Sequence, residues 1–302
     1  MSGAGPKFVW VDGQVVPADA RQISVSDRGF QLGDGIFETL RAKGGRCTEL
    51  SEHVARLRRS AAGLAFDLPD GVDAVLADGI AKLLAVEGLD GPGADASVRI
   101  TVSRGVWASR GLLPPRDVHL TPTVVIQAWP VEPPPVGHLE HGLALVASRV
   151  RRDPQNPIVT LKTTSRADYV YARIEARQAG ADDAMFLTST GHLSESTTAN
   201  VFLVRTAPDG VLELATPALD CAILPGTTRS WLLRWAASVG LRPVEGWLTP
   251  DELATADEAF LSSSVAGVLP VTRFNGHPIG DGRPGPWTRR ARADREAVFG
   301  QD

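Results

Sequence analysis

The sequence predicts an α+β protein of two domains, and three observations support this. The chain has 302 residues, which is more than one hydrophobic core usually organises. Strand-like segments outnumber helix-like ones and do not alternate with them regularly, as they would around a parallel sheet. A proline-rich stretch divides the chain. We expect a small α/β domain over 1–129, a linker over 130–139 and a larger, strand-rich domain over 140–302.

The first domain begins with β-structure. Asp12-Gly13 lies between two apolar runs, which indicates a hairpin because a type I′ turn needs positive φ at both central positions. Apolar residues recur at spacings of three and four over 48–66, with arginines opposite them, and predict an amphipathic helix. The stretches at 96–105 and 121–130 read as strands, the first by its alternation of apolar and polar residues.

The second domain repeats this mixture with more strands. A strand is expected at 142–148, and another apolar run, 158–161, reads as a strand that ends at Lys162. A helix over 166–180 follows and is closed by Gly180. One further helix, 227–240, begins after Pro225-Gly226, and the remaining segments between turn signals are strands: 183–189, 200–205, 211–216 and 258–264.

Composition narrows the classes of function. A net charge of −4 with dispersed basic residues gives no electrostatic case for nucleic acid. No stretch is apolar enough to span a membrane, the N-terminus lacks the pattern of a secretory signal, and two cysteines cannot build a disulfide framework. We expect a cytoplasmic protein without nucleic-acid or membrane partners. No metal is expected, because the one close histidine pair, His138 and His141, lacks supporting ligands.

Lys162 is the first candidate for chemistry. It follows an apolar run and precedes three hydroxyl residues, Thr163, Thr164 and Ser165. Burying an ammonium favours its neutral form, which attacks carbonyls and can hold a Schiff base. Taken alone, the residue is better explained as a lysine whose stem packs while its head reaches water. A second motif is needed to decide.

The second motif lies at 191–204. Glu195 precedes a cluster of hydroxyls and an asparagine that leads into an apolar strand. A Schiff-base lysine that works with pyridoxal phosphate needs a carboxylate against the pyridine nitrogen, because the protonated ring is the better electron sink. Glu195 is a candidate for that carboxylate, although it also fits a solvated turn residue.

These motifs, together with Leu224-Pro225-Gly226-Thr227-Thr228-Arg229, resemble the signature of class IV aminotransferases, which are fold-type IV enzymes that use pyridoxal phosphate. The resemblance extends over nearly the whole chain. It implies that Lys162 is the catalytic lysine, forming the internal aldimine and acting as general base. The cofactor-binding residues that it implies, besides Lys162, are Glu195 for the ring nitrogen and, for the phosphate, Arg56, Thr227, Thr228 and Ser264. It also implies a homodimer.

Within the family, the substrate-facing residues point to the D-amino-acid aminotransferase and 4-amino-4-deoxychorismate lyase branch. The resemblance implies that Arg110 binds the substrate carboxylate, with Arg28, Phe37 and Thr39 as further substrate-binding residues. For Arg41 and Arg99 we expect structural ion pairs instead.

Two departures from the family pattern bear on specificity. Leu112 stands where D-amino-acid aminotransferases carry a histidine, and Arg166 stands where branched-chain enzymes carry a tyrosine, which argues against the branched-chain branch.

We therefore expect transfer of an amino group from a D-amino acid, with (R)-amines as further donors, to a 2-keto acid. The alternative within the family is a 4-amino-4-deoxychorismate lyase, which releases pyruvate and 4-aminobenzoate. A binding or scaffold protein would also fit the composition and predicts no effect of Lys162→Ala. A hydrolase would need a G-x-S-x-G elbow, which the sequence lacks.

Overall fold

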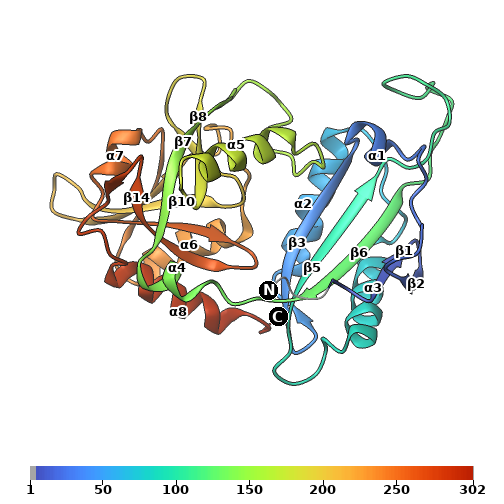
Figure 1. Cartoon of the computed structure of the whole chain (residues 1–302), viewed down its shortest axis with the longest axis horizontal. Coiled ribbons are helices and arrows are strands. Elements are labelled where there is room, and N and C mark those ends of the chain that lie inside the picture. The colour runs from blue at the N-terminus through green and yellow to red at the C-terminus, as the bar shows by residue number, and fades with distance from the viewer. Residues whose placement is uncertain (1–4, 302) are drawn as a thin grey trace. The chain divides into compact units, whose positions relative to one another are not determined.

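The computed structural model describes residues 5–301 (Figure 1). The chain divides into two compact units. The first comprises Met1–Glu132, Leu161–Arg166 and Phe299–Asp302, and the second comprises Pro133–Thr160 and Ala167–Val298. In the part of the chain that is described, no helix is long and apolar enough to cross a membrane.

The first unit is built on a six-stranded sheet in which every pair of neighbouring strands is antiparallel. The order across the sheet is β2-β1-β6-β5-β3-β4. The predicted hairpin is confirmed, since β1 and β2 are joined by Asp12 and Gly13, which have φ of 46° and 99°. The strands are β1 (Phe8–Val11), β2 (Gln14–Pro17), β3 (Gly35–Lys43), β4 (Arg46–Cys47), β5 (Asp95–Ser103) and β6 (Thr123–Pro130).

Two long helices cover one face of this sheet. They are α2 (Leu50–Gly63), which confirms the amphipathic pattern, and α3 (Val72–Glu87), which was not predicted from the sequence. Their apolar residues form one core cluster with alternate residues of the central strands, including Ile36, Val98 and Ile126. The short α1 (Arg28–Leu32) precedes β3 and has Asp27 as its N-cap. The alternation in β3 and β5 leaves their other residues on the opposite face.

The second unit contains a nine-stranded mixed sheet. Its order is β12-β11-β10-β13-β14-β7-β8-β9, with β15 paired to β14. The pairs β11/β12, β14/β7 and β7/β8 are parallel and the others are antiparallel. The strands are β7 (Leu143–Arg152), β8 (Asp183–Thr188), β9 (Leu193–Ser196), β10 (Asn200–Thr206), β11 (Leu212–Pro217), β12 (Arg242–Gly246), β13 (Glu258–Ser263), β14 (Gly267–Phe274) and β15 (His277–Pro278).

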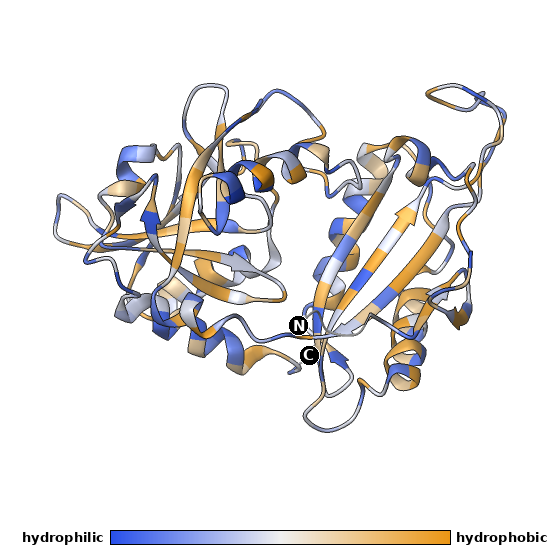
Figure 2. Ribbon diagram, viewed as in Figure 1, coloured by the Kyte–Doolittle hydropathy of each residue, from blue (hydrophilic) through white to orange (hydrophobic). Residues whose placement is uncertain are grey.

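Helices of the second unit pack against this sheet. The predicted helices appear as α5 (Ala167–Gln178) and α6 (Thr227–Ser238), and the C-terminal α8 (Pro286–Val298) joins α6 in a buried cluster around Phe202 and Phe260. Two short helices are α4 (Val136–Glu140) and α7 (Pro250–Ala254). Apolar residues concentrate along the strands of both sheets (Figure 2). The expected α+β class is confirmed.

Three segments differ in detail from the expectations. Residues 158–161 form turns and not a strand, because their backbone pairs with no neighbouring strand. The proline-rich stretch 130–139 contains the end of β6 and the start of α4, and the two units meet in sequence between residues 132 and 133. The segment Leu161–Arg166 belongs to the first unit, although we expected it in the second domain.

Candidate active site

Lys162 is held in the first unit by backbone pairing with β3. The Phe37 amide donates to the carbonyl of Lys162 at 2.9 Å, and the Thr164 amide donates to the carbonyl of Gly35 at 2.9 Å. The Lys162 amide donates in turn to the Ser60 hydroxyl on α2 at 3.1 Å. Three hydrogen bonds thus fix the backbone on both sides of the lysine, and the half-buried side chain projects from a rigid sheet edge.

The Lys162 amine lies beside the ring of Phe37. Its Nζ is 4.6 Å from the ring centroid, and the guanidinium carbons of Arg99 and Arg166 lie 4.0 and 5.7 Å from the same centroid. The expected substrate residue Phe37 is therefore close to the lysine. Thr39 follows on the same strand face and pairs in register with Arg99. A structural ion pair was expected for Arg99, but no described residue supplies one; its Nε donates instead to the Thr101 hydroxyl at 3.2 Å.

A buried ionic cluster occupies the other face of β3. The Glu38 carboxylate accepts two hydrogen bonds from Arg56, at 2.8 and 2.6 Å, and contacts Nδ1 of His53 at 2.7 Å. Burial raises the pKa of Glu38, but the hydrogen bonds and charge of Arg56 and the contact with His53 outweigh this, and the pKa falls to about 2. Burial lowers the pKa of His53 despite the Glu38 carboxylate. Arg56, the expected phosphate-binding residue, is thus oriented by a bidentate carboxylate that was not predicted to belong to the site.

Glu195 is a buried carboxylate on β9 of the second unit. Its Oε2 accepts from the Leu224 amide at 2.9 Å and the Asn200 amide group at 3.4 Å. Its Oε1 accepts from the Tyr169 hydroxyl at 3.3 Å and lies 3.5 Å from the Arg152 guanidinium. Both carboxylate oxygens of Glu195 therefore have polar partners within the unit. The alternative of a solvated turn residue is wrong for Glu195.

Arg152 is a residue of this cluster that sequence reasoning missed. It is 4% exposed, donates to the Val159 carbonyl at 2.9 Å and also hydrogen-bonds the Tyr169 hydroxyl. Burial lowers its pKa, but the charge of Glu195 and the contacts with Tyr169 raise it overall, so Arg152 stays charged. It ends β7, far from Glu195 in sequence, and no local pattern distinguishes it from the neighbouring arginines.

Two of the three expected phosphate residues of the second unit meet at the start of α6. The Thr227 hydroxyl lies 3.2 Å from the Ser264 hydroxyl, and the N-cap of the helix is Gly226, which has no side chain. The first amides of a helix and its dipole favour an anion at this position. The Thr228 hydroxyl is buried instead, and it accepts a hydrogen bond from the Arg295 guanidinium of α8 at 3.3 Å.

The other arginines of the first unit have distinct surroundings. Arg41 fulfils the expectation of a structural ion pair, with Nε 2.7 Å from Asp95. Arg28 is 2% exposed, bonds Asp34 at 2.8 Å and donates to the carbonyls of Gly111 and Leu112, so it fixes the loop that carries Arg110. Arg110 itself is exposed on that loop.

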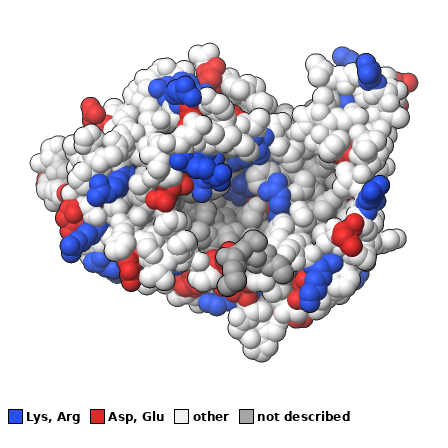
Figure 3. All heavy atoms as spheres, in the orientation of Figure 1, with Lys and Arg blue, Asp and Glu red and all other residues white. Residues whose placement is uncertain are grey.

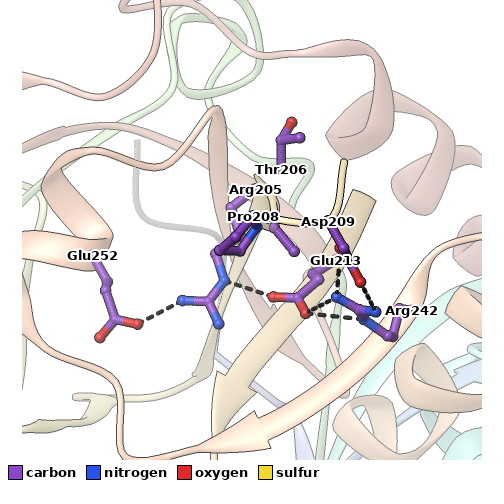
Figure 4. Close-up of a pocket in the computed structure, with 8 residues that line it drawn as sticks. Arg205, Thr206, Pro208, Asp209, Glu213, Arg242 and Glu252 are labelled. Carbon is purple, nitrogen blue, oxygen red and sulfur yellow. Dashed lines mark hydrogen bonds and ion pairs between the residues drawn. The ribbon is translucent and has the colours of Figure 1, made fainter. Parts of the chain in front are cut away.

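A pocket at the β10–β11 hairpin is lined by arginines and carboxylates that pair with one another (Figure 4). Arg205 lies 2.5 Å from Glu252 and 2.8 Å from Glu213, and Arg242 lies 2.8 Å from Glu213 and 2.7 Å from Asp209. The charges alternate and satisfy one another, which is the arrangement of a surface ion-pair network. Acidic and basic side chains are also interspersed on the face shown in Figure 3. Within residues 5–301, no group of three or more His, Cys, Asp or Glu side chains could hold a metal ion.

Comparison with known proteins decides the family. The family described as amino-transferase class IV matches residues 35–274. The chain belongs to the class IV aminotransferases. It is 35% identical over 285 residues to a putative branched-chain-amino-acid aminotransferase of Methanocaldococcus jannaschii, covering 93% of each chain. It is 29% identical over 281 residues to the D-alanine aminotransferase of Bacillus licheniformis, again covering 93% of each.

The fold of this class IV aminotransferase matches that of solved relatives. The T.th. branched-chain amino acid aminotransferase, solved with pyridoxamine 5′-phosphate, superposes with a TM-score of 0.87 at 27% identity, covering 98% of this chain and 95% of that one. The chain is thus a pyridoxal-phosphate-dependent enzyme. Each unit by itself carries side chains that suit this cofactor chemically. The first has an amine for its aldehyde, and the second has a buried carboxylate for its ring nitrogen and hydroxyls at a helix N-terminus for its phosphate.

Proposed function

We propose that this class IV aminotransferase transfers the amino group of a D-amino acid to a 2-keto acid. The observation that carries the proposal is the cationic surroundings of Phe37, beside the Lys162 amine. A pocket for a branched-chain side chain should be apolar, because burying an unpaired charge against hydrocarbon is costly. The preference for D-amino acids rests on the loop that carries Arg110, which resembles the corresponding loop of D-amino-acid aminotransferases.

Different residues of the chain would have different roles in such a reaction. Pyridoxal phosphate, when bound, supplies an electron sink for the electrons released at the donor Cα. Lys162 holds the cofactor and moves the Cα proton as general base. Glu195, which lies 3.5 Å from the Arg152 guanidinium, would face the ring nitrogen of the cofactor.

Hydroxyls and one guanidinium would hold the phosphate. Thr227 and Ser264 present hydroxyls at the start of α6, and Arg56 presents a guanidinium. Because Glu38 and His53 fix the rotamer of Arg56, the arginine is oriented before the cofactor binds. We also propose that the enzyme acts as a homodimer, as the family resemblance implies.

Transamination of branched-chain L-amino acids is the second candidate. It is favoured by the relative that is 35% identical, which is named a putative branched-chain-amino-acid aminotransferase, and by the superposition with the T.th. enzyme. The two candidates differ in the stereochemistry and side chain of the donor, and both use the same Lys162.

The experiment is a half-reaction on the holoenzyme. The visible absorbance band of the bound cofactor is followed after addition of D-alanine, D-glutamate, L-leucine or L-valine, with Lys162→Ala as the control that should lack the band. Bleaching by the D-amino acids alone supports the proposal. Bleaching by L-leucine and L-valine alone supports the branched-chain candidate, and no bleaching by any donor leads to an assay of pyruvate release from 4-amino-4-deoxychorismate.

A further inference from the structure

The C-terminal helix α8 buries an arginine against the beginning of α6 in the second unit. Arg295 is 1% exposed, which places it among the largest fully buried side chains of the chain. Its guanidinium donates to the Thr228 hydroxyl at 3.3 Å and lies 5.3 Å from the ring centroid of Trp231. Thr228 is the second residue of α6 and Trp231 the fifth. A cation is thus buried beside the N-terminal end of this helix.

This placement is the reverse of what the helix itself favours. The N-terminus of a helix carries a partial positive charge, so cations are stabilising at its C-terminus and acids at its N-terminus. The first turn of α6 contains no acidic residue, and its N-cap, Gly226, has no side chain to accept from the free amides. The charge of Arg295 therefore adds to the positive potential of the helix end. An anion at the start of α6 would relieve the repulsion between them.

The two threonines of the first turn have different partners. The Thr227 hydroxyl lies 3.2 Å from that of Ser264, where the proposed phosphate site lies, and the Thr228 hydroxyl is engaged by Arg295. The arginine is held in turn by packing, because α8 and α6 share one buried apolar cluster. Arg295 therefore fixes the first turn from its buried side and leaves the Thr227 side to the ligand.

We propose that Arg295 is a positioning residue that strengthens the binding of the cofactor phosphate at the start of α6. It acts through its hydrogen bond to Thr228 and through its charge, which reaches further in the protein interior than in water because the interior screens it less. The inference rests on the phosphate site proposed above. It adds to that site a residue from the C-terminal helix, whose contribution depends on its positive charge.

The test compares pyridoxal phosphate with pyridoxal, which has the same ring and aldehyde but no phosphate. The affinity of the full-length protein for each is measured by absorbance titration after the bound cofactor has been removed. Arg295→Met and Arg295→Gln remove the charge, Arg295→Lys keeps it, and Arg234→Gln is the matched control on the exposed face of α6.

The expected effect is specific to the phosphate. Arg295→Met and Arg295→Gln should each weaken binding of pyridoxal phosphate about tenfold and that of pyridoxal at most about twofold, since only the former carries the anion. Arg295→Lys should stay within about threefold of wild type for both ligands, because the charge is retained. Arg234→Gln should leave both affinities unchanged.

A purely structural role for Arg295 gives a different result. Equal losses for pyridoxal phosphate and pyridoxal, or unchanged affinity for both, would overturn the inference. If Arg295→Met does not fold, the polar Arg295→Gln and the charged Arg295→Lys carry the same comparison.

Ser264→Ala separates this inference from the phosphate site on which it rests. If Ser264→Ala weakens pyridoxal phosphate and the Arg295 variants do not, the site stands and the inference fails. If neither change weakens it, the proposed phosphate site is itself wrong. No amino donor is used, so the result does not depend on whether D-amino acids are the substrates.

Discussion

Replacement of Glu38 by glutamine should destabilise the first unit strongly. The carboxylate is fully buried and accepts two hydrogen bonds from Arg56 and one contact from His53. Glutamine keeps the shape but removes the charge, and leaves the Arg56 guanidinium buried without its counter-ion. Loss of one partner of a buried ion pair costs about 3–5 kcal/mol.

The pKa of Glu38 gives a second way to calculate how much stability this replacement should cost. Hydrogen bonding and the charge of Arg56 outweigh burial and lower the pKa from 4.5 to about 2. A lowered pKa in the folded state means that the ionised form stabilises folding. This stabilisation is complete above pH 4.5 and is lost as the pH falls toward 2. This lowering of the pKa corresponds to about 3 kcal/mol of folding stability at pH 7, of which about 1 kcal/mol should remain at pH 3.

The assay is urea unfolding followed by tryptophan fluorescence at pH 7 and pH 3, at one protein concentration. The free energy of unfolding of Glu38→Gln should lie about 3 kcal/mol below wild type at pH 7, and the gap should narrow to about 1 kcal/mol at pH 3. Glu52→Gln, on the exposed side of α2, is the matched control and should cost at most about 1 kcal/mol at both pH values. Equal losses for the two variants, or a gap that does not change with pH, would refute the reasoning.

Three further predictions concern the cofactor and the thiols. Lys162→Ala should abolish the visible band of the cofactor and transamination, and a retained band in the absorbance spectrum would exclude Lys162 as its attachment point. Gly226→Ala would place a Cβ 2.2 Å from the Asn200 side-chain oxygen, and it should lower affinity for pyridoxal phosphate by disturbing the start of α6; a titration of absorbance that matches wild type would contradict this. Burial raises the pKa of Cys47 to about 11, and burial with the charge of Asp220 does the same for Cys221. Native protein at pH 7.5 should therefore resist iodoacetamide, as judged by mass spectrometry, while urea-unfolded protein should be alkylated at both thiols.

Local patterns in the sequence were sufficient for much of the fold. The Asp12-Gly13 hairpin, the amphipathic helix α2 and the alternating strand β5 were predicted because turn chemistry and periodicity involve residues close in the chain. The short strand predicted at 158–161 was wrong, because an apolar run does not specify whether a partner strand is available. The family signature around Glu195 likewise lies in consecutive residues, so the sequence alone indicated the family.

The partners of the site residues depended on tertiary structure. Arg152 reaches Glu195 because β7, β8 and β9 are neighbours in the sheet, and Glu38 reaches Arg56 because α2 packs on β3. Arg99 was expected to make a structural ion pair, and its position over Phe37 follows from the register between β5 and β3. The sequence determines which side chains are charged. Strand order and register decide which of those charges meet, because these pairings join residues far apart in the chain.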